Sequence, residues 1–264
     1  MDTLSQIIAD KKLAVESAKR RMPFEQLRTT ALNVRADMKV HALRTALTGS
    51  AINIIAEFKR RSPSKGTIRE NADAATLARS YESAGAAAIS VLTEGNYFAG
   101  SLDDLLAVRA VVSIPILRKD FVFDEWQVHE SAAAGADALL LIVAALDDET
   151  LERLLRLTEE NLGMDALVEV HTREEMERAV AHGAKLIGVN NRDLRTFDVS
   201  TETSLQLAQF APSATVLVSE SGLTPEEVLK LKAAGYSGFL IGETLMRAAD
   251  PKRQLRIFKG ENSG

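Results

Sequence analysis

Short, nearly continuous apolar runs recur along the whole chain and predict eight β-strands. Runs without a regular polar alternation are typical of a parallel sheet that is covered on both faces. The predicted strands are Ile52–Phe58, Ala86–Leu92, Ile114–Lys119, Asp137–Val143, Ala166–Val170, Lys185–Asn190, Thr215–Ser221 and Ser237–Gly242.

Segments with helical periodicity separate these strands, for example residues 72–84, 150–158 and 225–234. Glycine follows several of the helical segments, where it is the usual left-handed cap because it has no Cβ to clash. Eight such units predict a single (β/α)8 TIM barrel, whose usual size is about 250 residues. An open doubly wound sheet is the alternative, but no GxGxxG pattern follows the first strand. The capping glycines are Gly85, Gly135, Gly183 and Gly235.

The first fifty residues precede the first strand and contain an amphipathic helix of their own. A second helical piece is expected from about Lys39 to Leu47. We therefore expect an N-terminal helical extension over residues 1–50, packed on a catalytic barrel over residues 51–264, with one domain overall. The extension either plugs the bottom of the barrel or covers part of its mouth. The apolar face of the first helix is formed by Leu4, Ile7, Ile8, Ala14, Val15 and Ala18.

Composition removes several classes of function. The net charge of −5, with evenly scattered Lys and Arg, argues against a nucleic-acid surface. Cysteine is absent, so disulfides and thiolate nucleophiles are excluded, and the four histidines form no HExxH pair, so no metal is expected. The longest apolar run, Ala138–Leu146, is too short to span a bilayer. We expect a cytoplasmic protein without a membrane partner.

Charged or amide residues stand where five of the predicted strands end, although buried strands have no use for charge. Barrel active sites are built at this end of the strands. Alternation of side chains places Lys59 on the same side as Glu57, and Phe121 beside Lys119. A cluster of mixed charge can hold one group as an acid and another as a base; a purely structural cap of ion pairs is the alternative. The five residues are Glu57, Lys119, Glu169, Asn190 and Glu220.

Glycine at the ends of the last two strands indicates an anion site, because barrels frequently bind phosphate there. Ser221 is the last residue of the seventh predicted strand and Gly222 follows it, and Gly242 is the last residue of the eighth and Glu243 follows it. A carboxylate repels phosphate, so the Glu243 side chain is expected to point away. The basic, turn-rich loop after the first strand, with Ser62, is expected to close over an acidic ligand.

Four segments resemble the indole-3-glycerol-phosphate synthase family, and the resemblance extends over essentially the whole chain. The resemblance implies a (β/α)8 lyase of tryptophan biosynthesis. Its reaction converts 1-(2-carboxyphenylamino)-1-deoxyribulose 5-phosphate to indole glycerol phosphate with loss of carbon dioxide and water, and no cofactor is implied. The segments are Ile55–Gly66, Leu117–Phe121, Val189–Leu194 and Ser219–Gly222.

The resemblance also implies roles. Lys119 is the expected general acid for ring closure, and Glu169 and Lys59 are expected to transfer protons in the dehydration. Four residues are expected to position substrate and tune the lysines: Glu57, Asn190, Glu220 and Ser221. The substrate and its phosphate are assigned to Ser62, Arg192, Gly222, Gly242, Glu243, Phe121 and Leu194, of which the last two form an apolar wall for the arene. Glu243 departs from the family, where a small hydroxyl residue is common.

Other functions remain open at this point. Lys119 is also a candidate for a Schiff base in an aldolase-type barrel acting on a phosphorylated sugar. A phosphosugar isomerase would leave most of the charged cluster unused, and a degenerate barrel would bind a phosphorylated ligand without turnover. In each case the expected partner is a phosphorylated small molecule, and the expected state is a monomer or weak homo-oligomer.

Overall fold

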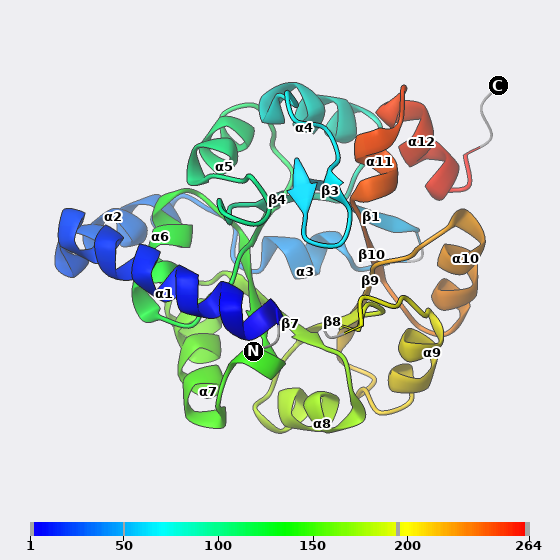
Figure 1. Cartoon of the computed structure of the whole chain (residues 1–264). Coiled ribbons are helices and arrows are strands. Elements are labelled where there is room, and N and C mark those ends of the chain that lie inside the picture. Colours follow the sequence, from blue (N-terminus) through cyan, green and yellow to red (C-terminus); the bar gives the residue numbers. More distant parts are fainter. Residues whose placement is uncertain (1–2, 50, 194–195, 262–264) are drawn as a thin grey trace.

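A closed barrel of eight parallel strands forms the centre of the computed structural model, which describes residues 3–49, 51–193 and 196–261. Viewed along its axis, the barrel is surrounded by helices (Figure 1). Every predicted strand is present, so the TIM-barrel prediction is confirmed. The strands are β1 (Asn53–Phe58), β4 (Ala88–Leu92), β5 (Ile116–Lys119), β6 (Ala138–Ile142), β7 (Asp165–Val170), β8 (Leu186–Asn190), β9 (Val216–Glu220) and β10 (Gly238–Ile241).

The three helical segments predicted from periodicity correspond to α4 (Ala74–Ser83), α7 (Asp148–Arg156) and α10 (Pro225–Ala233), with bounds that agree within two residues. Aspartate, serine or threonine caps the start of most outer helices, as Asp73 does by accepting a hydrogen bond from the Thr76 amide. The four predicted capping glycines all have positive φ, from 81° to 101°. The other outer helices are α5 (Leu102–Arg109), α6 (Glu125–Ala133), α8 (Arg173–Ala181), α9 (Glu202–Ala208), α11 (Glu243–Arg247) and α12 (Pro251–Phe258), with a 3₁₀ turn η1 (Val143–Ala145) and a π-helical turn η2 (Leu157–Asn161).

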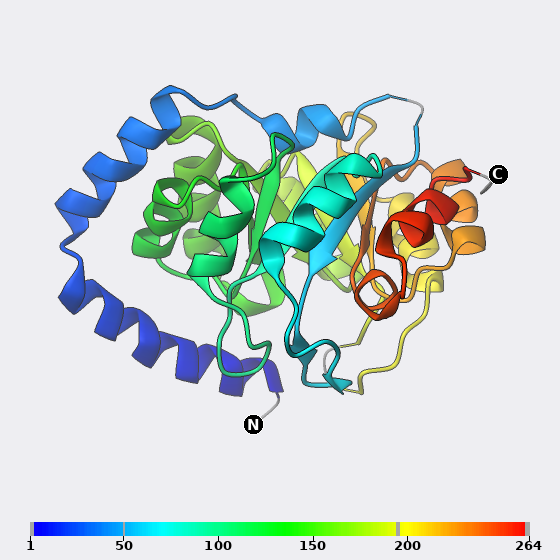
Figure 2. The same ribbon diagram turned by 90° about the horizontal axis from the view of Figure 1, so that it is seen from above.

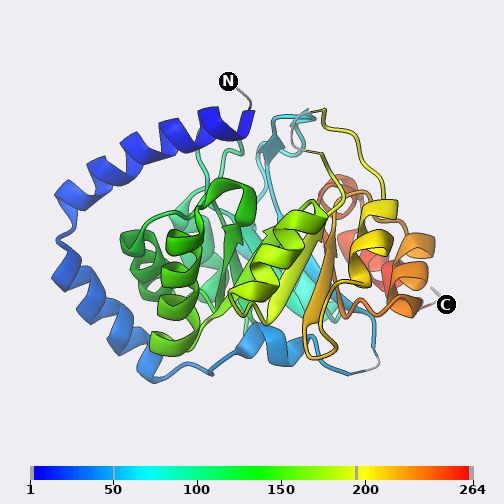
Figure 3. The same cartoon turned by 90° about the horizontal axis from the view of Figure 1, so that it is seen from below.

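Three helices precede the barrel: α1 (Thr3–Arg21), α2 (Phe24–Ala36) and α3 (Ala42–Ala46). They wrap one side of it, with α1 along the end where the strands finish and α3 at the opposite end (Figures 2 and 3). Leu43 and Leu47 are fully buried in the apolar cluster that fills the barrel interior. The extension therefore both plugs the bottom of the barrel and reaches its mouth.

Three local features differ from the sequence-based expectation. The helix α2 was not predicted, because only three of its side chains are buried and its apolar periodicity is weak. Ala14, expected on the apolar face of α1, is exposed. The loop after β1 also contains a two-stranded hairpin, β2 (Arg61–Ser62) and β3 (Gly66–Thr67), which is too short to show a sequence pattern.

A small apolar cluster outside the barrel anchors the extension. Val15 of α1, Leu27 of α2 and Trp126 of α6 pack together. The Trp126 indole also donates a hydrogen bond to the Met22 carbonyl, at 3.2 Å, and Lys19 forms an ion pair with Asp124 at 2.6 Å. Trp126 is thus a packing residue.

Replacing Leu27 by alanine should lower the free energy of unfolding by about 2–3 kcal/mol, because the side chain is 5% exposed and its removal leaves a cavity. Leu13→Ala in the same extension should change it by less than about 0.5 kcal/mol, because Leu13 is 73% exposed. Urea unfolding of both variants measures the difference, and equal losses would contradict this account of the anchor.

Candidate active site

The strand register brings the predicted charged residues to the same height at one end of the barrel. Lys119 lies beside Leu92 of β4, Glu169 lies beside Ile142 of β6, and Glu220 lies beside Asn190 of β8. Residues two positions earlier on these strands, such as Leu117, Leu167 and Val218, belong to the apolar cluster inside the barrel. Side chains at the strand tips therefore follow the inward-facing series and lie directly above the apolar core.

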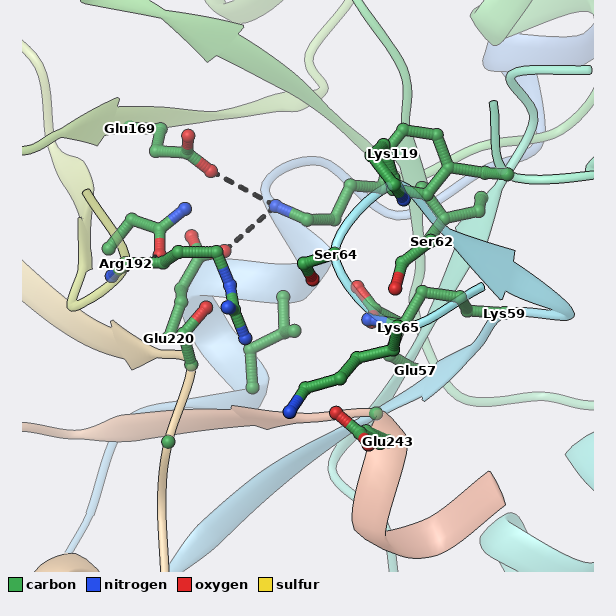
Figure 4. A pocket seen from close by; sticks show the side chains of 18 of the residues that line it. Glu57, Lys59, Ser62, Ser64, Lys65, Lys119, Glu169, Arg192, Glu220 and Glu243 are labelled. Atoms are coloured by element: carbon green, nitrogen blue, oxygen red, sulfur yellow. Dashed lines mark hydrogen bonds and ion pairs between the residues drawn. The ribbon is translucent and has the colours of Figure 1, made fainter. Parts of the chain in front are cut away.

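Lys119 is at the centre of this arrangement. Its Nζ lies 3.1 Å from Glu169 Oε2 and 2.8 Å from Glu220 Oε2 (Figure 4). The side chains are 15%, 3% and 2% exposed, respectively, so two carboxylates share one nearly buried ammonium group. Glu57 is equally buried and forms an ion pair with Lys59. The prediction that Glu57 and Lys59 face the same side is confirmed.

Arg118, next to Lys119 on β5, faces away from the mouth and toward α6, as side-chain alternation along a strand requires. Arg118 pairs with Asp120 at 3.1 Å and with Glu130 at 2.7 Å. Asp120 also accepts a hydrogen bond from Lys11 of α1 at 2.7 Å. Lys119 is thus flanked by residues that fasten β5 to the N-terminal helix.

Two glycines make room for the carboxylates. A Cβ at Gly188 of β8 would overlap Glu220 Oε1, and one at Gly242 would overlap the Glu57 carboxylate. Gly188 was not singled out in the sequence, because a glycine within an apolar strand carries no sign of what lies across the barrel. Gly242, expected only at the phosphate, also leaves space for Glu57.

Burial and mutual attraction shift the pKa values of the cluster in different directions. Burial alone would lower the pKa of Lys119, but the carboxylates of Glu169, Glu220 and Glu57 outweigh it and raise the pKa. Burial alone would raise the pKa of Glu169, but Lys119, His171 and a hydrogen bond from Asn190 lower it.

Glu220 responds in the opposite sense. Burial raises the pKa of Glu220 to about 7, and the negative charges of Glu169 and Glu57 contribute to the rise. Lys119 lowers this pKa but only partly offsets the rise, because it is shared with Glu169. The two glutamates titrate as a coupled pair in which Glu220 takes the first proton. The cluster therefore holds an ionised carboxylate beside one that changes protonation near neutral pH.

A cavity of about 470 Å³ opens above this cluster, and every predicted site residue in the described part of the chain lines it. Leu194 lies outside the described residues. Phe121 and Phe98, with ring centroids 6.2 Å apart, form one apolar wall.

The sequence did not single out Phe98 or Phe197, nor the inward-facing Leu140 and Ile142 of β6; strand alternation alone could have identified the last two. The other lining residues that were not singled out as ligand contacts include Thr3, Leu4, Ile7, Lys65, Val199, Leu223 and Thr244.

The loops after β9 and β10 have the backbone geometry expected beside a ligand. Ser221 and Gly222 have φ of +69° and +73°, and the Ser221 carbonyl accepts a hydrogen bond from the Asn191 side chain at 3.1 Å. Positive φ in a residue other than glycine is a strained conformation found at ligand sites. Glu243 lines the cavity but accepts a hydrogen bond from Arg247, at 3.0 Å, which directs its charge toward its own helix.

Neither a metal centre nor a membrane span is found in the part of the chain that the structure describes. No group of three or more His, Cys, Asp or Glu side chains there has the geometry to hold a metal ion. No described helix combines the length and apolarity needed to cross a membrane. Separately from these findings, the charged cluster and the apolar walls of the cavity offer proton transfer by lysine and glutamate.

Comparisons with known proteins agree with this geometry. Residues 4–258 match the family model described as Indole-3-glycerol phosphate synthase. A relative of that name from Carboxydothermus hydrogenoformans is 47% identical over 260 residues, which cover 96% of this chain and 98% of the relative. Another of that name from Micrococcus luteus is 48% identical over 262 residues, covering 98% of this chain and 97% of the relative.

Solved structures with lower identity share the fold. KGPDC from Streptococcus mutans has a TM-score of 0.61 and 16% identity, covering 80% of this chain and 97% of that one. Thiamine phosphate pyrophosphorylase from Pyrococcus furiosus has a TM-score of 0.58 and 16% identity, covering 80% of this chain and 95% of that one. At this identity the likeness concerns the barrel alone.

The raised pKa of Glu220 predicts a pH-dependent contribution to stability. Between its ordinary pKa of 4.5 and about 7, the folded chain binds more protons at this site than the unfolded chain, so stability falls as pH rises through this window. Glu220→Gln removes the effect, and its free energy of unfolding relative to wild type should rise by about 2–3 kcal/mol from pH 5 to pH 8. Urea unfolding at several pH values measures this, with the exposed Glu226→Gln as control. A pH-independent difference would be inconsistent with it.

Proposed function

The chain belongs to the indole-3-glycerol phosphate synthase family, and we propose that the cluster around Lys119 carries out the reaction of that family. The chain is accordingly a carboxy-lyase of tryptophan biosynthesis that acts on a phosphorylated small molecule. The observation that carries the assignment of residues is the position of Lys119, between Glu169 and Glu220 at the floor of the cavity.

The cavity suits the two ends of 1-(2-carboxyphenylamino)-1-deoxyribulose 5-phosphate. The aromatic ring would lie against the apolar wall that includes Phe121. The phosphate would lie near Ser62 and the backbone at Gly222 and Gly242, which line the cavity with Arg192. This placement leaves the substrate carbonyl near the floor of the cavity, within reach of a lysine.

Ring closure requires an acid on the carbonyl oxygen. Lys119 is a cation at neutral pH because burial is outweighed by its carboxylate neighbours, which raise its pKa. It protonates the carbonyl oxygen while the aromatic carbon that bears the carboxyl group attacks the carbonyl carbon. Loss of carbon dioxide then returns the electron pair of the broken bond to the ring and restores aromaticity.

Dehydration requires a second acid and a base. The new hydroxyl leaves as water after protonation, and a proton is removed from the ring that has just closed. Lys59 and Glu169 are the candidates, since both line the cavity and the lowered pKa of Glu169 keeps it ionised. Glu57 holds Lys59 through their ion pair, while Asn190 donates a hydrogen bond to Glu169.

The proposed phosphate site consists of backbone groups as well as side chains. Ser62 is buried in the hairpin after β1, and Arg61 next to it donates hydrogen bonds to carbonyls of the β4–α5 loop. These contacts hold the hairpin at the mouth. Gly222 offers its backbone without a Cβ, whereas Glu243 contributes a charge that its bond to Arg247 partly balances.

The electrostatics argue against the aldolase alternative. A Schiff base needs a neutral amine, and the carboxylates around Lys119 raise its pKa, which keeps the amine protonated. An isomerase would use a single acid–base pair. The binding-module alternative predicts ligand binding without turnover, which a direct assay distinguishes.

The proposal extends to the setting of the enzyme. We propose activity as a monomer or weak homo-oligomer, since the charged cluster around Lys119 is already assembled within a single chain. We also keep the division into an extension over residues 1–50 and a catalytic barrel over 51–264, supported by helices α1 to α3 on the barrel surface. A cytoplasmic location fits an enzyme of amino-acid biosynthesis.

Purified protein mixed with 1-(2-carboxyphenylamino)-1-deoxyribulose 5-phosphate in buffer with chelator should produce indole fluorescence. Lys119→Ala should lower kcat by about 10²–10⁴, because it removes the general acid, while binding measured by calorimetry persists through the phosphate. The exposed Lys230→Ala serves as the control. Unchanged turnover in Lys119→Ala would refute its role, and wild-type binding without fluorescence would favour the binding module.

Gly222→Ala should raise KM about tenfold or more with a smaller effect on kcat, because a Cβ there would overlap Val199 and displace the proposed phosphate loop. Gly183→Ala is a matched control, since Gly183 also has positive φ but has open space around it. Steady-state kinetics measure both. If KM changed equally in the two variants, backbone strain alone would explain the effect, and the proposed role of Gly222 beside the phosphate would be contradicted.

A further inference from the structure

His171 lies two residues beyond Glu169, in the connection between β7 and α8. Its Nε2 is 3.4 Å from Glu169 Oε1, and its Nδ1 is 3.2 Å from Glu175 Oε2. The His171 side chain is 11% exposed and is not among the residues that line the cavity. The imidazole therefore connects a proposed proton-transfer residue to a second carboxylate outside the cavity.

Helix capping explains only part of this arrangement. Thr172 caps α8, and Glu175 accepts a hydrogen bond from the His171 amide at 2.7 Å, in the manner of a capping box. A cap needs no particular side chain at residue 171. The ring nevertheless directs a buried Nε2, which has no hydrogen-bond partner of its own, at the Glu169 carboxylate.

Charges on four elements face the ring or its partner. Glu169 of β7, Glu175 of α8 and Glu220 of β9 raise the pKa of His171, although burial opposes them. Lys119 of β5 binds the other oxygen of Glu169 at 3.1 Å. Glu169 thus has one cationic partner inside the cavity and a second potential one outside it.

We propose that His171 is a positioning residue for the synthase reaction: its protonated ring, held by Glu175, orients Glu169 toward Lys119 and keeps the Glu169 carboxylate ionised. This inference rests on the proposed role of Glu169 in proton transfer. The His171 ring does not line the cavity, so in this proposal it does not touch the substrate. It acts through Glu169 Oε1, whereas Lys119 binds Glu169 Oε2.

The inference has a definite sign. A positive charge beside a carboxylate lowers its pKa, so removal of the ring charge raises the pKa of Glu169. As the pH is lowered, Glu169 then loses its charge at a higher pH than in the wild-type enzyme. The acid limb of the plot of kcat against pH therefore moves to higher pH. KM should change little, because the ring does not line the cavity.

The test uses His171→Gln and Glu175→Gln, both of which retain hydrogen bonding without charge, together with the double variant. His182→Gln, also on the α8 unit but beside Asp148 and away from the cavity, is the matched control. The acid limb of kcat should move up by about one pH unit in His171→Gln and by less in Glu175→Gln. The double variant should equal His171→Gln, because both changes act through one charge.

A second measurement does not depend on activity. In the wild-type protein the His171 ring, assigned in NMR spectra by elimination with His41→Gln, His129→Gln and His182→Gln, should titrate above the ordinary value of about 6.5, and Glu175→Gln should lower its midpoint. A midpoint at or below the ordinary value would overturn the proposal, even if His171→Gln failed to fold.

The kinetic outcomes separate the two hypotheses. An active wild-type enzyme whose acid limb is the same in His171→Gln would overturn the role of His171 and leave the proposed function intact. A shift of equal size in His182→Gln would do the same, because the effect would then be nonspecific. An inactive wild-type protein would overturn the proposed function, and the role of His171 with it.

Discussion

The structure depends on one ammonium group shared between carboxylates at the mouth of the barrel. Removing Glu169 and Glu220 from water is costly, and the cost is tolerable only if a cation lies within hydrogen-bond distance of both. Lys119 meets this condition at 3.1 and 2.8 Å. Because the attraction to one lysine cannot fully stabilise two buried charges, the glutamates divide into one that stays ionised and one that binds a proton near pH 7. This unequal division places a group that changes protonation near pH 7 beside an ionised one, as the proposed acid–base chemistry requires.

The rest of the molecule holds this shared ion pair in place. Glycine at positions 188 and 242 leaves space for the carboxylates of Glu220 and Glu57. Directly after β5, Asp120 joins Arg118 to Lys11, so the N-terminal helix is attached one residue away from Lys119. At the opposite end of the barrel, Leu43 and Leu47 complete the apolar interior. The charged cluster and the apolar core are thus successive layers of the same inward-facing series.

Much of the site was predictable because strand alternation is a local rule. Applied to the sequence alone, the rule places Glu57 with Lys59 and separates Lys119 from Arg118. Side-chain periodicity could not predict α2 in the same way, because few of its side chains are buried. It also could not predict the hairpin at Arg61–Thr67, because each of its strands is only two residues long. Phe98 and Phe197 were missed because they lie in loops, where no periodicity indicates which side chains face the cavity.

The sequence by itself determined the eight βα units, the residue types at the strand tips and the family. These features are encoded locally, in apolar runs, capping residues and contiguous motifs. Only the tertiary structure decided which tips meet, because the register of a closed barrel sets Lys119 against Glu169 and Glu220, 50 and 101 residues away. It also decided that Gly242 makes room for Glu57 and that His171 faces Glu169. Those relations depend on distances across the barrel and on the charges gathered there, and no local pattern records them.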